Sequence, residues 1–332
     1  MKVLSIRRIT ADSRHNAFTG ACWFKKNLYI AYRQGDDHEC NFGRIIVLRS
    51  RDKGITWDTV TVLRGRCDTR DAHLYTDGER LFAVCFENER KTGGRSGCAI
   101  TVDGDQWTDW NPFSGANGYV LWRPVFQEGK HFCAGYQSAG KEPAIHWFES
   151  ADGQNWERCH KIHDSENDLP SECFLEFQKD GSALMIIRRE KPPKHPLLAR
   201  SKPPFDTWDL QILDDLQLTG PSLWTADNHI YIAGRWHPNG PKAFGEGGYS
   251  AHTAIFRVHE GETALQCVLP SGPHPDHSYL GVARHPEDPN RFSLSFYGNA
   301  VAPTDPAVNQ WNHPDVYLAE VVCGKDLNEL KP

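Results

Sequence analysis

The sequence has no long apolar run and no convincing amphipathic helical window. Its start, MKVLSIRRIT, holds one apolar triplet followed by arginines, which is too short for the apolar region of a secretion signal. No later stretch approaches the roughly 20 apolar residues that a membrane-spanning helix needs. We therefore expect no membrane partner and a cytoplasmic protein, or a secreted one if a signal has been trimmed from this sequence.

Paired cysteines and basic runs are missing as well. Ten cysteines are scattered singly along the 332 residues, without a CxxC pair, so buried free thiols in a reducing compartment are favoured over a disulfide framework. The net charge is −6 and no basic run occurs, which argues against a nucleic-acid partner. A local basic pocket for an acidic small ligand is compatible with this composition. We expect neither a cofactor nor a bound metal.

What the chain does have is a short pattern of Ser or Thr, Asp, Gly and Trp that returns about every 50 residues. The copies are SRDKGITW (50–57), TVDGDQW (101–107) and SADGQNW (150–156). Recurrence at such an interval indicates a repeat architecture. In each copy the Asp can bond turn amides, the Gly can adopt a positive φ and the Trp can pack between sheets. These residues are thus predicted to build turns and not to take part in catalysis.

Short apolar runs bounded by Gly, Pro, Asp and Asn follow one another along the whole chain, as strands do. Four runs make one repeat, and six repeats start about 50 to 58 residues apart, within the range of propeller blades. The sixth repeat lacks an outer strand, and the N-terminal run KVLSIRRI belongs to no repeat. We predict an all-β single domain over residues 1–332, a six-bladed β-propeller of four-stranded antiparallel blades whose N-terminal strand closes the last blade.

The three Asp motifs on a six-fold β repeat resemble the Asp-box, or BNR, repeats of the sialidase superfamily, and the likeness covers essentially the whole chain. The phrases HNAFT, SECFLEF and SYLGV resemble bacterial sialidase-like proteins. Sialidases hold the substrate carboxylate with three arginines, use a Tyr activated by a Glu as nucleophile, and use an Asp as acid/base. The resemblance therefore implies a propeller that hydrolyses a glycan.

Carried over residue by residue, the resemblance implies that Tyr279 of HSYLGV is the nucleophile and that Glu172 of SECFLEF is its base. Arg189 matches one arginine of the triad. The acid/base would come from the loop RQGDDHEC, which offers Asp36 or Asp37, with His38 beside them.

The sequence departs from the sialidase pattern at the other two arginines. Where the family opens its first blade with an Arg-Ile-Pro motif, this chain has His15-Asn16-Ala17, and blade five offers His252 in YSAHTAIF. His15 has two readings. In the first, His15 is a general base beside a uronic carboxylate and Tyr279 is the acid, an arrangement that resembles propeller-type polysaccharide lyases. In the second, His15 forms a hydrogen bond with a sugar hydroxyl. Because two of the three arginines that bind the substrate carboxylate are not found, we predict that the protein is not a true sialidase.

Independently of the resemblance, the first residues of innermost propeller strands ring the axis at one mouth. Polar residues there, and near the ends of the second strands, are candidate ligands of a substrate. The expected rim is rich in arginine and suits an acidic sugar. Its candidate substrate-binding residues, besides Arg189, are Arg33, Arg70, Asp71, His73, Arg123, Arg235 and Tyr297.

These features predict a carbohydrate-active enzyme, an exo-glycosidase that releases an acidic or otherwise unusual sugar from a glycan or oligosaccharide. Two alternatives stay open. One is a polysaccharide lyase that acts by β-elimination at a uronic acid through His15 and Tyr279. The other is a glycan-binding propeller without turnover.

Overall fold

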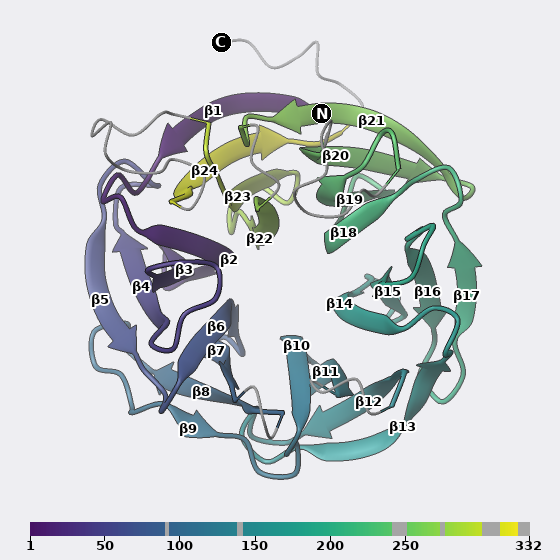
Figure 1. The fold of residues 1–332 in the computed structure, drawn as a ribbon, viewed down its shortest axis with the longest axis horizontal. Helices are drawn as coiled ribbons and strands as arrows, with labels where there is room; N and C mark the ends of the chain where they lie inside the picture. Colours follow the sequence, from purple (N-terminus) through teal and green to yellow (C-terminus); the bar gives the residue numbers. More distant parts are fainter. Residues whose placement is uncertain (90–92, 138–141, 241–250, 273–275, 301–312, 325–332) are drawn as a thin grey trace.

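The computed structural model describes residues 1–89, 93–137, 142–240, 251–272, 276–300 and 313–324. These residues form strands and no helix, and accordingly no helix long and apolar enough to cross a membrane is found among them. Six four-stranded antiparallel sheets surround a central axis (Figure 1). The predicted all-β, six-bladed propeller is thus confirmed.

Every blade has the same strand order from the axis outward. The innermost strands are β2 (His15–Phe24), β6 (Asp68–Thr76), β10 (Tyr119–Gln127), β14 (Pro170–Phe177), β18 (Leu218–Ala226) and β22 (Ser278–Arg284). The second strands are β3 (Asn27–Gly35), β7 (Leu81–Asn88), β11 (Lys130–Gln137), β15 (Ala183–Arg189), β19 (His229–Trp236) and β23 (Arg291–Gly298). The third strands are β4 (Arg44–Ser50), β8 (Arg95–Thr101), β12 (Ala144–Ser150), β16 (Leu197–Ser201), β20 (His252–His259) and β24 (Asp315–Val322). The outer strands are β5 (Asp58–Leu63), β9 (Asn111–Pro112), β13 (Glu157–Asp164), β17 (Asp209–Ile212), β21 (Glu262–Leu269) and β1 (Lys2–Arg8).

The apolar cores lie between neighbouring blades. One of them joins side chains of β2, β3 and β4 to side chains of β6, β7 and β8. Because both faces of a blade are covered by its neighbours, a middle strand reads as a continuous apolar run. All residues of β24, and all but the first residue of β3, are buried. The outer strand β1 instead alternates between exposed and half-buried residues, because its outward face meets solvent.

The N-terminal strand closes the ring, as predicted. β1 pairs antiparallel with β24, from Lys2 opposite Val322 to Arg8 opposite Tyr317. In Figure 1 the purple β1 and the yellow β24 lie side by side in the last blade. The Arg8 guanidinium also binds the Asp315 carboxylate at 2.6 Å. The two ends of the chain therefore share one sheet, which leaves no open edge on β24.

The three Asp motifs form the turns between the third and fourth strands of blades one to three. In the third turn, Asp152 Oδ1 accepts hydrogen bonds from the amides of Gln154 and Asn155, at 2.8 Å each, and from the Ser150 hydroxyl at 3.1 Å. Asp carboxylates accept turn amides in the same way at Asp52 and Asp103. All three turns lie at the periphery of the blades, so they stabilise the sheets and do not reach the axis.

We expect Asp152→Ala to lower the free energy of unfolding by about 1 to 3 kcal/mol, because the turn amides lose their acceptor. Partial burial disfavours the charged form, but the hydrogen bonds from Asn155 and Gln154 lower the Asp152 pKa to about 2. A depressed pKa contributes stability above the unfolded value of 3.8, and that contribution is lost as the pH falls toward 2. Urea denaturation of both proteins at pH 7 and pH 3 measures this. A stability difference that does not shrink at pH 3 would contradict the assignment.

Candidate functional site

A β-bulge at the same place in all six innermost strands directs side chains to the axis. The ladder between each innermost strand and its neighbour shifts register by one residue there. In five blades the first residue of the bulge has a positive φ, a conformation that residues other than Gly adopt at a cost. These five residues are Phe18 (54°), Asp71 (59°), Arg123 (56°), Gly220 (59°) and Tyr279 (47°). The fold thus builds strain into the ring of residues that faces the axis.

A pocket of about 210 Å³ opens at the mouth formed by the N-terminal halves of the innermost strands. Several of its lining side chains are aromatic, and its polar side chains, tyrosines included, come from six different segments. We call it the front pocket. Its lining residues are Phe18, His38, Arg70, Asp71, Phe86, Asn88, Val120, Trp122, Tyr136, Glu172 and Tyr279.

Tyr279, Glu172 and Arg188 form a closed hydrogen-bonded triangle at this pocket. The Tyr279 hydroxyl donates to Glu172 Oε1 at 2.7 Å. Arg188 Nη1 donates to Glu172 Oε2 at 2.8 Å and to the Tyr279 oxygen at 2.9 Å. The structure therefore brings together the predicted Glu and Tyr, from β14 and β22, and adds an arginine from β15.

The three groups have complementary protonation states. Burial, followed by the Glu172 charge, raises the pKa of Tyr279 well above its usual range, so the resting residue is a neutral phenol. Burial works against the charge of Arg188, yet the neighbouring Glu172 carboxylate raises its pKa. A carboxylate is thus in place to receive the phenolic proton, and a cation is in place to stabilise the phenolate that would result.

Aromatic packing fixes the position of the Tyr279 ring. Phe18 meets it edge-on with the ring centroids 5.4 Å apart, and the Arg235 guanidinium lies over it at 5.6 Å from the centroid. On blade five, the bulge residue is Gly220. A Cβ atom at Gly220 would come within 3.0 Å of the Tyr279 ring. Blade five therefore has no side chain at the first residue of its bulge, and the Tyr279 ring occupies that space.

Asp71 is the second carboxyl group of the front pocket. It is half-buried on β6, and among the described residues no hydrogen bond to its carboxyl group is found. Burial, reinforced by the negative charge of Glu172 and opposed by Arg70, raises its pKa to about 6. A carboxyl group with a pKa in this range can both give and take a proton near neutral pH.

Behind the pocket, Asp276 gathers hydrogen bonds from four side chains. His15 Nε2 and His38 Nδ1 share its Oδ2 at 2.8 and 2.7 Å, and the Tyr297 hydroxyl donates to Oδ1 at 2.7 Å. Arg235 Nη2 lies 3.5 Å from Oδ1. Burial disfavours its charge, but the two histidine hydrogen bonds hold the Asp276 pKa well below its usual range. Asp276 is not among the predicted site residues, because it lies just before β22 and matches no catalytic residue of the sialidase pattern.

His15 is held inside this network and does not line the front pocket. It is buried, and its Nδ1 lies 3.3 Å from Arg33 Nη1. Since an arginine can only donate, Nδ1 is the acceptor and Nε2 carries the proton given to Asp276. Both nitrogens are thus engaged, which differs from the predicted general base. The histidine that does reach the pocket is the half-exposed His38.

His15, His38 and Asp276 are also the one group in the described part of the chain whose ligand atoms could hold a metal ion, since they lie within 4.8 Å of one another. Two histidines and a carboxylate are a common donor set for metals, but the hydrogen bonds of His15 oppose a metal here. The protonated Nε2 of His15 would have to lose its hydrogen, and its other nitrogen faces an arginine. The hydrogen bonds themselves account for the arrangement.

The arginine of the site is Arg188 and not the predicted Arg189. Arg189 Nε donates to Asp168 at 2.8 Å and Nη1 to the carbonyl of His195 at 3.2 Å, so it serves the connections around blade four. Adjacent residues on a strand point to opposite faces. The pair Arg188-Arg189 in IIRRE therefore always sends one arginine toward the pocket and one away. Strand alternation predicts that only one of the two faces the pocket, and the register of β15 decides which one.

Four further predicted residues lie at the edge of the front pocket or away from it. Asp36 is at the surface, its side chain 89% exposed, and pairs with Arg14 at 3.4 Å. Asp37 caps the amide of His38. Arg70 lines the pocket and donates to Asp68 at 2.9 Å. Fully buried Arg33 also binds Asp68, at 2.8 Å. The structure does not bring Asp36 or Asp37 to the pocket.

Arg123 and His73 belong to a different cavity. Both side chains line a second hollow, which is built from the C-terminal halves of the innermost strands. The bulges separate this hollow from the front pocket, because five of the six innermost strands contribute earlier residues to the pocket and later residues to the hollow, while β18 lines the hollow alone. The predicted single rim is thus two distinct sites on one axis.

No protein-family model matches the chain, and no curated protein matches its sequence. Solved structures do match. A Dyadobacter fermentans protein of unknown function is similar over 96% of this chain and 99% of its own, with a TM-score of 0.71 and 14% identity. The α-L-arabinanase of Penicillium chrysogenum, solved with arabinobiose, is similar over 96% and 98% of the two chains, with a TM-score of 0.65 and 14% identity.

Trypanosoma rangeli sialidase, solved with the inhibitor DANA, matches 92% of this chain with a TM-score of 0.68 and 11% identity. The chain spans about half of that sialidase, 55% of its length. At these identities the likeness is one of fold. The chain therefore shares its propeller fold with proteins identified as a sialidase and an arabinanase.

Proposed function

We propose that the protein is a glycosidase that uses Tyr279 as its nucleophile. The observation that carries this proposal is the triangle of Tyr279, Glu172 and Arg188, in which a buried phenol donates at 2.7 Å to a carboxylate while a guanidinium contacts both oxygens. A structural tyrosine needs no such base. The shared fold with a sialidase and an arabinanase supports the reaction class.

In the first step the Tyr279 oxygen attacks the anomeric carbon and its proton passes to Glu172. Arg188 stabilises the charge that develops on the phenolic oxygen. Asp71, protonated, gives its proton to the departing glycosidic oxygen. In the second step the Asp71 carboxylate takes a proton from water, the hydroxide attacks the anomeric carbon, and the phenolate recovers its proton from Glu172. The configuration of the sugar is retained.

The size and charge of the front pocket favour one terminal sugar. Its volume of about 210 Å³ is below the roughly 300 Å³ at which pockets for drug-sized ligands begin, so exo action on a single residue is favoured. The arginines nearest to the reacting groups already form ion pairs with carboxylates of the protein. Arg188 holds Glu172 and Glu190, and Arg70 holds Asp68. A three-arginine clamp for a sialic acid carboxylate has no counterpart among these, and we propose another sugar as the substrate.

A panel of aryl glycosides, including an aryl sialoside, together with acidic oligosaccharides tests the proposal. We expect release of the aryl group from at least one non-sialic sugar and negligible release from the sialoside. A product with the ultraviolet absorbance of an unsaturated uronate would instead support the lyase alternative. Tight glycan binding without turnover across the panel would support a binding propeller.

Asp71 predicts the pH dependence of the reaction. Its pKa, raised to about 6, keeps the acid protonated below pH 6, and the acid is lost as the pH rises through 6. We expect the rate of glycosylation to fall above about pH 6. Asp71→Asn should lower it by roughly a hundredfold to ten-thousandfold for a sugar leaving group, and far less for a dinitrophenyl leaving group, which needs no proton.

The matched control for Asp71→Asn is Asp58→Asn on the outer strand β5, where the carboxylate is exposed and bound to Arg51. It should leave the pH profile unchanged. An equal loss of rate for both leaving groups in Asp71→Asn would assign the acid to another residue, with His38 the next candidate at the pocket.

A further inference from the structure

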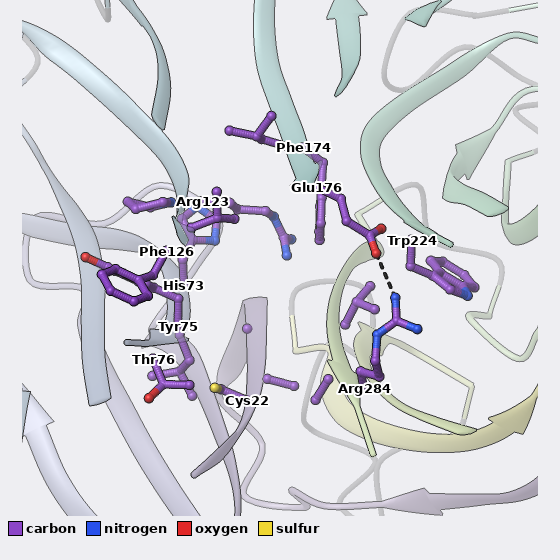
Figure 2. A pocket seen from close by; sticks show the side chains of 18 of the residues that line it. Cys22, His73, Tyr75, Thr76, Arg123, Phe126, Phe174, Glu176, Trp224 and Arg284 are labelled. Atoms are coloured by element: carbon purple, nitrogen blue, oxygen red, sulfur yellow. Dashed lines mark hydrogen bonds and ion pairs between the residues drawn. The ribbon is translucent and has the colours of Figure 1, made fainter. Parts of the chain in front are cut away.

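The second hollow on the axis has a volume of about 390 Å³, within the usual range for small-molecule sites. Figure 2 shows it from close by. Its walls are largely apolar, with the rings of Phe126, Phe174 and Trp224 around the space. Every bulge lies between it and the front pocket, so it is not a subsite of the proposed reaction. We call it the rear cavity.

The cationic side chain of Arg123 points into the rear cavity. Arg123 is 8% exposed, and among the described residues no hydrogen bond to its guanidinium is found; its Nε is fully enclosed and unpaired. The guanidinium lies over the Phe174 ring at 4.8 Å from the centroid and extends into the cavity in Figure 2. Burial lowers the pKa of Arg123 to about 10, so the group stays charged. A buried, unpaired charge is costly and calls for an acceptor.

Three further polar atoms of this cavity have no hydrogen-bonding partner among the described residues, the two ring nitrogens of His73 and one oxygen of Glu176. His73 is 5% exposed, and neither ring nitrogen has a hydrogen-bonding partner within the described residues. Burial keeps its pKa well below the usual range, so it is neutral. On the opposite wall, Glu176 Oε1 accepts from Arg284 at 2.7 Å and from Thr225 at 3.0 Å, while Oε2 is enclosed and unpaired.

Among the side chains that line the rear cavity, one positive charge is not balanced by a negative charge. Glu176 pairs with Arg284, and burial raises the Glu176 pKa to about 7 although Arg284 opposes the shift, so this pair adds no net negative charge to the cavity. His73 is neutral, and Arg123 remains. Asp71 and Glu172 favour the charge of Arg123 from the front side of the bulges, but neither lines the rear cavity. An anion with a single charge and an apolar body is the ligand that completes this balance.

We propose that the rear cavity is a binding site for a small monocarboxylate with an apolar body, held by Arg123 through its carboxylate. The apolar body packs between Phe126, Phe174 and Trp224. A hydroxyl at the far end of the ligand can donate to Glu176 Oε2. This proposal is independent of the proposed glycosidase activity.

Calorimetric titration of the full chain with 3-phenylpropionate and 3-(4-hydroxyphenyl)propionate tests this, with the matching amides as neutral controls. We expect one site per chain, a carboxylate that binds at least about tenfold more tightly than its amide, and tighter binding of the hydroxylated acid. Arg123→Met should remove the preference for the carboxylate. The matched control Arg70→Met changes an arginine of the front pocket and should leave binding unchanged.

Arg123→Met is expected to fold, because it replaces an unpaired buried charge by an apolar group of similar length, and its melting temperature should equal or exceed that of the wild type. A second variant, Val125→Trp, fills the cavity while keeping Arg123 and should also abolish binding. Carboxylate binding that survives both variants, or no binding to the wild type, would overturn the proposal.

Discussion

Tyr279→Phe is expected to lower kcat by at least about a thousandfold while leaving the protein folded. The variant removes only the hydroxyl that would form the covalent bond, and loss of a nucleophile is among the most damaging single changes in an enzyme. The ring keeps its edge-on contact with Phe18, and Arg188 keeps its hydrogen bond to Glu172. Rates on the best glycoside of the panel, with circular dichroism as the check on folding, measure the effect.

Glu172→Gln should cause a loss of similar size, because the amide cannot accept the phenolic proton and no longer balances Arg188. The matched control is Tyr231→Phe, a buried tyrosine of β19 whose ring stacks on Trp224. It should keep full activity. A 2-fluoro glycosyl fluoride should label Tyr279, as mass spectrometry of the digested protein can show. Activity that survives Tyr279→Phe, or label on another residue, would refute the nucleophile.

Deletion of residues 2–8 is expected to lower the free energy of unfolding by roughly 3 to 9 kcal/mol. The deletion removes the ladder of β1 on β24, in which six residue pairs are matched, at about 0.5 to 1.5 kcal/mol per hydrogen bond. It also removes Arg8, the ion-pair partner of the buried Asp315. Burial already raises the pKa of Asp315 to about 6. For a domain with a total stability of roughly 5 to 15 kcal/mol, this is a large share.

Arg8→Met separates the two contributions, because it removes the ion pair and keeps the strand. We expect it to cost less than half as much as the deletion. The deleted protein should also associate at high concentration, since β24 then presents a free edge. An unchanged melting temperature after the deletion would show that β1 does not hold the ring together.

The pattern of the sequence was sufficient for the fold. Six sets of four apolar runs, bounded by turn residues, predict blades because local periodicity and turn chemistry depend on near neighbours in the chain. The unpaired first run KVLSIRRI and the incomplete sixth repeat predicted the closure of β1 on β24, since an open sheet edge is unfavourable. The turns built by the three Asp motifs could also be predicted from the sequence, because all of their hydrogen bonds join residues that are close together in the chain.

Within the site, the resemblance of the sequence to sialidases singled out Glu172 and Tyr279, but only the tertiary structure decided which side chains surround them. Whether Arg188 or Arg189 faces the axis depends on the register of β15, and a shift of one residue would exchange them. The bulge at Arg123 sends that side chain to the rear cavity, away from the predicted front rim. Asp276 becomes the centre of a network only because the ring brings the start of β22 beside β2. The contacts of Asp276 with His15 and His38 join residues more than 200 positions apart, and no local pattern encodes them.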